Sequence, residues 1–146
     1  LVGEELREHV DYIEGIDLST GMLREASKKN IYNKLTQRDI TEYLIEANLN
    51  FDYFIASDVF IYVGDLSRIF NYIKKRNKKN GKLIFSTEHY NGTDFKIGPN
   101  GRYLHSKEYI ERLSKEYNFT LLLFEKIQLR KEKKKSVVGG LYTLAF

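Results

Sequence analysis

Short apolar segments that end at or just before an aspartate recur three times within the first 60 residues. The aspartates are Asp17, Asp39 and Asp58, and helix-favouring sequence separates the segments. Strands that alternate with helices form a mostly parallel sheet covered by helices. The carboxyl ends of such strands share one edge, where ligands bind in open α/β sheets. The sequence therefore predicts an α/β three-layer sandwich with three carboxylates along its ligand-binding edge.

The spacing of apolar residues places the elements in a regular order. Expected helices cover residues 2–10, 22–29, 42–47, 66–73 and 106–117, and expected strands cover 12–16, 34–38, 51–57, 82–87, 120–127 and 137–145. Residues 51–57 form a near-continuous apolar run, which predicts a strand buried on both faces. A polar linker joins the last two strands, so we expect them to pair antiparallel. Residues 90–101 contain three glycines and the only proline, which predicts a functional loop.

Length and composition exclude several classes of protein. The 146 residues fit a single domain over 1–146. The absence of cysteine excludes disulfides and thiolate chemistry, and three scattered histidines lack the spacing of a zinc site, so we expect no metal. No apolar stretch approaches the roughly 20 residues of a membrane span, and no secretory signal is visible. We therefore expect a cytoplasmic protein that does not bind membranes.

The net charge is +4, and the most basic stretch covers residues 130–135. Its side chains could contact phosphate, but no aromatic residue alternates with them and Glu132 interrupts the run. A solvated turn is the simpler interpretation, and we do not expect nucleic acid as a partner.

Asp17 has the clearest chemical role of the three aspartates. A carboxylate at the end of a strand can accept hydrogen bonds from both hydroxyls of a ribose. Nicotinamide and adenosyl cofactors both present such a ribose, so the residues alone indicate an adenosine-containing cofactor and no more. Aspartate also begins turns and caps helices, and that structural role is open at each of the three positions.

Residues 15–23, with the sequence Gly-Ile-Asp-Leu-Ser-Thr-Gly-Met-Leu, resemble the second motif of S-adenosylmethionine-dependent methyltransferases. In that family an acidic residue binds ribose and the next apolar residue packs on adenine. The resemblance implies that Asp17 binds the ribose and Leu18 the adenine, with Met22 nearby. It also implies a class I, Rossmann-like fold and S-adenosyl-L-methionine as the cofactor.

The third motif of the same family resembles residues 37–40. This resemblance implies that Asp39 meets the adenine amino group, with Ile40 beside it. Residues 79–85 resemble the usual turn into the fifth strand of the family.

The fourth motif resembles residues 51–60. This resemblance implies that Asp58 and Val59 lie near the methionine part of the cofactor. Two further stretches, residues 62–66 and 101–106, are similar to a bacterial branch of these enzymes that is often associated with tetratricopeptide repeats.

One part of the family pattern is absent. The first strand and its Gly-x-Gly-x-Gly turn, which lets the backbone approach the cofactor closely, have no counterpart in this sequence. In the family fold that strand lies between the second and fourth strands. Because the sequence starts at Leu1, we expect one of two situations. Either the native protein supplies this segment, or the chain is an N-terminally truncated product with impaired cofactor binding.

Methyl transfer from a sulfonium is an in-line displacement, so a general base is needed only when the acceptor must lose a proton. The catalytic residues are therefore unknown from the sequence. His105 and Glu88 are candidates for a base, although His105 could simply precede a helix cap and Glu88 could be a solvated loop residue. Arg102 could bind an anionic substrate or form a salt bridge with an acid. Tyr62 and Tyr103 are further substrate candidates, whereas the other two histidines are expected at the surface.

Three classes of function remain open at this point. The first is a methyltransferase that acts on a small molecule or an exposed protein side chain. The second is an NAD(P)-dependent oxidoreductase, which a Gly-x-Gly-x-x-Gly turn upstream would favour. The third is a catalytically inactive remnant or an adenosine-cofactor-binding module. The oligomeric state is unknown.

Overall fold

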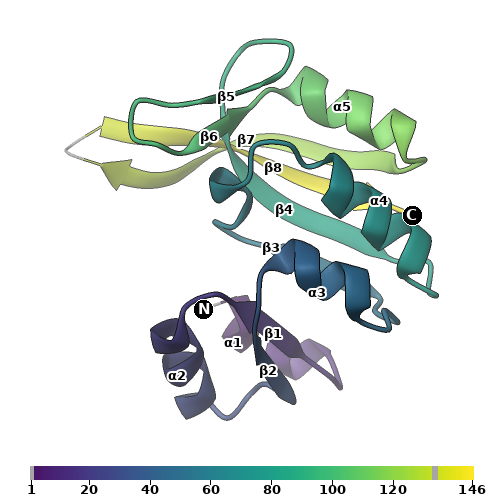
Figure 1. Ribbon diagram of the computed structural model, residues 1–146. Helices are drawn as coiled ribbons and strands as arrows, with labels where there is room; N and C mark the ends of the chain where they lie inside the picture. Colours follow the sequence, from purple (N-terminus) through teal and green to yellow (C-terminus); the bar gives the residue numbers. More distant parts are fainter. Residues whose placement is uncertain (1, 133–134) are drawn as a thin grey trace. The chain divides into compact units, whose positions relative to one another are not determined.

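The computed structural model describes residues 2–132 and 135–146. The described chain divides into two compact units, the first ending at Ala47 and the second running from Asn48 to Phe146 (Figure 1). Each unit has its own sheet. The single domain that the sequence suggests stays a prediction.

The first unit contains a two-stranded parallel sheet and three α-helices. Its elements are α1 (Val2–Leu6), the 3-10 helix η1 (Arg7–His9), β1 (Glu14–Asp17), α2 (Thr20–Lys28), β2 (Lys34–Gln37) and α3 (Ile40–Glu46). In the register of the pair, Glu14 lies opposite Lys34 and Asp17 lies opposite Gln37. The predicted order of helices and strands is confirmed here, and the strand boundaries differ from the prediction by no more than two residues.

Side-chain caps determine where α2 and α3 begin. The Oγ of Ser19 accepts a hydrogen bond from the Met22 N–H at 3.3 Å. The Oδ1 of Asp39 accepts from the N–H groups of Thr41 at 2.8 Å and Glu42 at 3.2 Å. The first N–H groups of a helix have no partner within the helix, so a cap of this kind stabilises it by about 1 kcal/mol.

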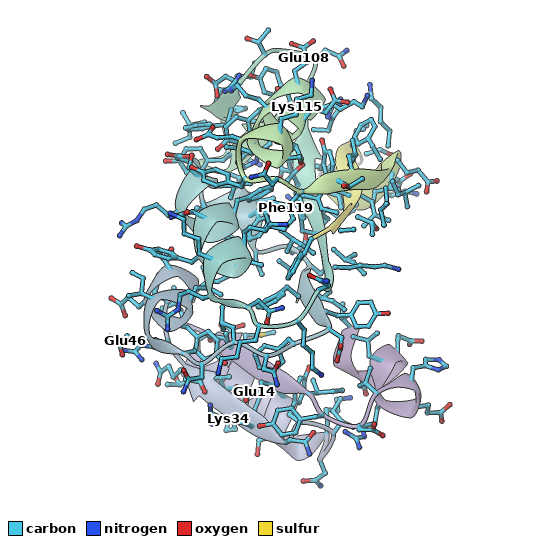
Figure 2. The ribbon with its side chains drawn as sticks, turned by 90° about the vertical axis from the view of Figure 1, so that its right-hand side faces the viewer. Glu14, Lys34, Glu46, Glu108, Lys115 and Phe119 are labelled. Atoms are coloured by element: carbon cyan, nitrogen blue, oxygen red, sulfur yellow. The ribbon has the colours of Figure 1, made fainter. Side chains whose placement is uncertain are left out.

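Glu14 joins the amino end of β1 to β2 and α3. The Tyr43 hydroxyl donates to its Oε2 at 2.8 Å, and the Tyr12 hydroxyl donates to its Oε1 at 2.9 Å. The Lys34 Nζ lies 3.2 Å from Oε2 (Figure 2). Burial opposes ionisation of Glu14, but the hydrogen bonds and the Lys34 ammonium together lower its pKa. Because Glu14 lies at the opposite end of β1 from Asp17, its carboxylate has a structural role.

The second unit is built on a six-stranded mixed sheet. Its elements are β3 (Tyr53–Ala56), the 3-10 helix η2 (Phe60–Tyr62), α4 (Ser67–Arg76), β4 (Lys82–His89), β5 (Phe95–Ile97), β6 (Tyr103–His105), α5 (Lys107–Glu116), β7 (Thr120–Glu132) and β8 (Lys135–Ala145). The strand order is β5-β6-β4-β8-β7, and β3 pairs in parallel with the first half of β4. The predicted antiparallel pairing of the last two strands is confirmed.

Aromatic rings on one face of this sheet form the core of the second unit. Phe85 on β4 stacks on Tyr142 of β8, with ring centroids 5.1 Å apart. The ring centroid of Phe85 also lies 5.1 Å from that of Phe60 and 5.9 Å from that of Phe70. Figure 1 shows α4 and α5 alongside this sheet. All four rings are essentially inaccessible to solvent, so they supply much of the hydrophobic stabilisation of the unit.

The strand that the sequence presents as the most buried is exposed on one face, so the burial prediction for residues 51–57 is wrong. Ala56 is buried, but Tyr53 is 51% and Ile55 is 38% exposed. Side chains alternate between the two faces of a strand. The helices of the second unit therefore shield the face that carries Ala56, while Tyr53 and Ile55 point to the other face.

Two segments are more regular than predicted. The expected loop over residues 90–101 contains β5, which pairs with β6 in a hairpin that turns at Gly101, where φ is 77°. In the basic run, β7 extends to Glu132 and β8 begins at Lys135, so pairing continues into the expected turn. Residues 133–134 of that run lie outside the described residues. Both differences arise because pairing with a neighbouring strand stabilises extended backbone of low apolar content.

Candidate functional site

Asp17 is the last residue of β1, at the carboxyl end of the parallel pair. Its Oδ1 accepts a hydrogen bond from the Ser19 N–H at 2.8 Å, and its carbonyl oxygen accepts from the Arg38 N–H at 3.2 Å. These bonds hold the carboxylate at the edge of the sheet. Within the described residues, Oδ2 accepts no hydrogen bond from the protein. Since both oxygens of a carboxylate are acceptors, Asp17 has the capacity to bind the two hydroxyls of a ribose.

Leu18 and Met22 present apolar surface beside this carboxylate. Leu18 is 66% and Met22 is 49% exposed, which is high for large apolar side chains. The Leu18 carbonyl accepts a hydrogen bond from the Gln37 Nε2 at 3.1 Å, so the loop is tied to the end of β2. Asp17 and Met22 also line a small cavity of about 110 Å³ between β1 and α2. Apolar surface next to an acceptor suits the edge of a nucleoside.

Asp39 lies two residues beyond the end of β2, at the same end of the pair as Asp17. Its Oδ1 caps α3, which gives Asp39 a structural role. Within the described part of the chain, its Oδ2 accepts no hydrogen bond, so one oxygen is left to accept from an amino group. Ile40 follows at the first position of α3 and is half-buried.

Asp58 lies two residues beyond the end of β3 and adopts a left-handed backbone conformation, with φ of 55°. Its N–H donates to the Ser86 Oγ at 3.3 Å. Its exposed carboxylate lies 3.6 Å from the Nη1 of Arg130 on β7. Aspartate tolerates a positive φ better than most residues, which suits it to this sharp turn at the strand end. Val59 follows and is half-buried.

Glu88 lies within β4 and is 4% exposed, so the expectation of a solvated loop residue is wrong. Its Oε1 accepts a hydrogen bond from the Arg130 guanidinium. The Nη1 of Arg102, on the β5–β6 hairpin, lies 3.8 Å from the same oxygen. Of the two roles expected for Arg102, the structure therefore shows the salt bridge with an acid. A buried carboxylate that contacts two guanidinium groups positions those arginines, and this arrangement does not favour a free general base.

The remaining substrate candidates differ in exposure. His105 is completely buried, and its Nε2 donates to the Gly64 carbonyl at 2.8 Å. Burial lowers the pKa of His105 and favours its neutral form. Tyr103 is half-buried and packs edge-on against Phe95. Tyr62 is 66% exposed, so of these three side chains it presents the most surface to a ligand.

Arg130 and His89 are two residues that the sequence did not single out. Arg130 is hidden in a basic run, and nothing in that run distinguishes it from its neighbours. His89 is expected at the surface, but β4 continues past the expected end at Thr87 and His89 is half-buried at the end of the strand. In both cases the missing information is the extent of strand pairing.

The structure therefore groups the candidate residues within each unit. In the first unit, Asp17 and Asp39 lie at the same end of the β1–β2 pair. In the second unit, Arg130 links Asp58 to Glu88, which also contacts Arg102. No group of three histidine, aspartate or glutamate side chains in the described part of the chain could hold a metal ion. None of the helices in residues 2–132 and 135–146 has the length and apolar character needed to cross a membrane.

One family of known proteins matches the first part of this chain. Residues 2–85, more than half of the chain, match a family model described as a methyltransferase domain. Among curated proteins, none matches this sequence.

Solved structures share the fold at low sequence identity. A methyltransferase dependent on S-adenosylmethionine from Methanosarcina mazei is 14% identical over 97% of this chain and 85% of its own, with a TM-score of 0.71. Magnesium protoporphyrin IX methyltransferase from Synechocystis, with bound S-adenosylmethionine, is 15% identical over 97% and 62%, with a TM-score of 0.68. The 1,6-didemethyltoxoflavin-N1-methyltransferase from Burkholderia thailandensis is 11% identical over 97% and 64%, with a TM-score of 0.74. This chain therefore spans less than two thirds of the length of the last two proteins.

Proposed function

This chain belongs to the methyltransferase domain family, and from that premise we propose that it transfers a methyl group from S-adenosyl-L-methionine to a small-molecule acceptor. The observation that carries the proposal is the Asp17 carboxylate, held at the carboxyl end of β1 with an oxygen that no described protein group occupies. Two structural neighbours are named for small ring compounds as acceptors, which supports a small molecule over a protein side chain.

The residues at the carboxyl end of β1 and β2 suit the adenosine half of this cofactor. Asp17 accepts hydrogen bonds from the ribose hydroxyls, Leu18 packs on the adenine beside Met22, and Asp39 accepts from the adenine amino group. Ile40 adds apolar surface next to Asp39. These roles come from the family resemblance, and the free carboxylate oxygens and exposed apolar side chains support them.

The methionine half of the cofactor carries a positively charged sulfur. When the cofactor is bound, this sulfur is a good leaving group for methyl transfer. Asp58 and Val59 lie at the end of β3 and contact the methionine part in this proposal. Transfer is an in-line displacement, so the main contribution of the protein is to position the two reactants.

The free edge of β1 supports the expectation of a further strand. β1 pairs with β2 on one side, and its other edge has no partner strand in the described residues. A glycine-rich strand that paired there would bring its turn close to Asp17. We keep this segment as a proposal for the native protein, and we expect weak cofactor affinity in its absence.

Isothermal titration calorimetry with S-adenosylhomocysteine tests the proposed function. We expect saturable binding to the wild-type chain, and binding weakened roughly tenfold or more by Asp17→Asn, because a charged acceptor of hydroxyl hydrogen bonds is lost. Asp11→Asn is the matched control, because Asp11 is an exposed aspartate of the same unit outside the predicted site. Equal affinity of the two variants would contradict the role of Asp17. No binding by a folded wild-type chain would favour the inactive remnant, and saturable binding of NAD in its place would favour the oxidoreductase.

A further inference from the structure

A cavity of about 320 Å³ lies in the second unit at the carboxyl end of β4. Its walls come from the last residue of β4 and the loop after it, the first turns of α5 and the middle of β7. None of the residues assigned to the cofactor lines it. The volume is at the lower end of the range for ligand pockets, so it suits a small ligand.

Flat rings form part of the cavity wall. Phe124 on β7 and His89 at the end of β4 have ring centroids 5.6 Å apart, and Tyr90 follows in the loop. Both ring nitrogens of His89 are buried, and neither makes a hydrogen bond of normal geometry within the described residues. His89 therefore contributes the flat face of its ring to the cavity wall. Planar ligands pack well against surfaces of this kind.

One positive charge in the cavity has no carboxylate partner. The Lys126 Nζ lies 3.2 Å from the amide oxygen of Asn91, and no carboxylate of the described residues is within salt-bridge distance of it. An amide oxygen accepts a hydrogen bond but carries no net charge. The ammonium of Lys126 is therefore available to pair with an anionic group of a ligand.

The other charged groups that face the cavity compensate one another or lie in solvent. On α5, the Lys107 Nζ is 2.9 Å from the Glu111 Oε1, so this pair is neutral overall. Glu108 is exposed near the amino end of α5, where solvent screens its charge (Figure 2). Burial and the Lys126 ammonium lower the pKa of His89, which favours the neutral ring. Lys126 is therefore the cation of the cavity lining that no described carboxylate neutralises, and like Glu108 it is exposed to solvent.

We propose that this cavity binds the methyl acceptor, and that the acceptor is a small planar compound with an anionic oxygen that pairs with Lys126. The inference rests on the proposed function, because it takes the ligand of the cavity to be the acceptor. The position at the carboxyl end of β4 supports it, since ligands of open α/β sheets bind at that edge.

4-Nitrophenol is a suitable probe, because it is planar and its absorbance distinguishes the neutral from the ionised form. At a pH where both forms are present, adding wild-type protein should raise the absorbance of the ionised form in a saturable way. Lys126→Gln should weaken this binding roughly tenfold or more, because a charge-assisted hydrogen bond is lost. Lys115→Gln removes the same charge from the exposed carboxyl-terminal end of α5 and should leave binding unchanged (Figure 2).

Proton NMR of the imidazole rings shows where the probe binds, because the chain has three histidines. The His89 signals, assigned with a His89→Gln variant, should shift on titration, whereas those of exposed His9 in the first unit should not. Equal affinity of Lys126→Gln and wild type, or equal shifts of both histidines, would overturn the inference. Binding of S-adenosylhomocysteine without any binding of 4-nitrophenol would overturn this inference alone. Binding of 4-nitrophenol that depends on Lys126, in a chain that does not bind S-adenosylhomocysteine, would support the cavity and overturn the proposed function.

Discussion

The Glu88 carboxylate on β4 accepts a hydrogen bond from the Arg130 guanidinium on β7, although the two residues are 42 positions apart in the chain. The same carboxylate oxygen lies 3.8 Å from Arg102, and Arg130 also lies 3.6 Å from Asp58. One buried acid therefore connects two strands, a hairpin and the turn after β3. Glu88 is the residue before His89, which ends β4 and lines the cavity proposed for the acceptor.

Loss of the Glu88 charge should destabilise the second unit. Glu88→Gln keeps the shape of the side chain but leaves two partly buried guanidinium groups without their buried acid. We expect the free energy of unfolding to fall by about 1–3 kcal/mol, because the charge-assisted hydrogen bond from Arg130 is weakened while Arg130 keeps Asp58 as a second partner. Urea denaturation measures this. Glu125→Gln, at an exposed position of β7, should change stability by no more than about 0.5 kcal/mol. Equal effects of the two substitutions would show that the network contributes no stability.

Asp39 has two assigned roles that a pair of substitutions can separate. Asparagine caps helices as well as aspartate does, so Asp39→Asn should leave thermal stability nearly unchanged. The same variant should bind S-adenosylhomocysteine more weakly if the carboxylate meets the adenine amino group. Asp39→Ala should lose both functions, with a further cost of about 1 kcal/mol in unfolding free energy from the missing cap. Unchanged cofactor affinity in both variants would restrict Asp39 to its structural role.

Stability should depend on pH through His105. Burial lowers the pKa of His105 in the folded state, while the unfolded chain has a pKa of about 6.5. As the pH falls below that value, the unfolded state takes up a proton that the folded state does not, so the free energy of unfolding decreases. His89 has a lowered pKa and contributes in the same direction.

Melting temperatures at pH 7.5 and pH 5.5 test this dependence. The decrease should be smaller for His105→Gln, whose amide can donate to the Gly64 carbonyl in place of Nε2. The control His9→Gln, at an exposed position, should keep the full decrease. If His105→Gln shows the same decrease as wild type, the buried ring is not the group that titrates.

The Tyr109 hydroxyl connects α5 to the start of α4. It accepts a hydrogen bond from the Leu66 N–H at 2.8 Å and donates to the Asp65 Oδ1 at 3.0 Å. Tyr109→Phe should cost about 1–3 kcal/mol of unfolding free energy, because the buried Leu66 N–H loses its acceptor. Urea denaturation should show a lower midpoint with an unchanged slope. Tyr72→Phe, whose hydroxyl makes no hydrogen bond within the described residues, should be nearly neutral, and an equal loss in both variants would contradict this role.

Short sequence patterns were sufficient to predict the helices and strands that contacts between neighbouring residues stabilise. In the structure Ser19, Asp39 and Ser106 are caps whose hydrogen bonds reach N–H groups two or three residues ahead. The first unit follows the predicted order closely for this reason. Asp17 was also placed at a strand end by its sequence context alone, and the resemblance to the methyltransferase family followed from the same short motifs.

The extent of the strands and the contacts of buried charged groups were decided by tertiary structure. The sequence alone determined an alternating α/β chain and the family to which its motifs belong, because these depend on residues close together in the chain. Only the fold decided that β4 runs on to His89, that Glu88 is buried against Arg130, and that His105 is enclosed. Each of these depends on partners tens of residues away. Their proximity is set by how the strands pair, which no short stretch of sequence encodes.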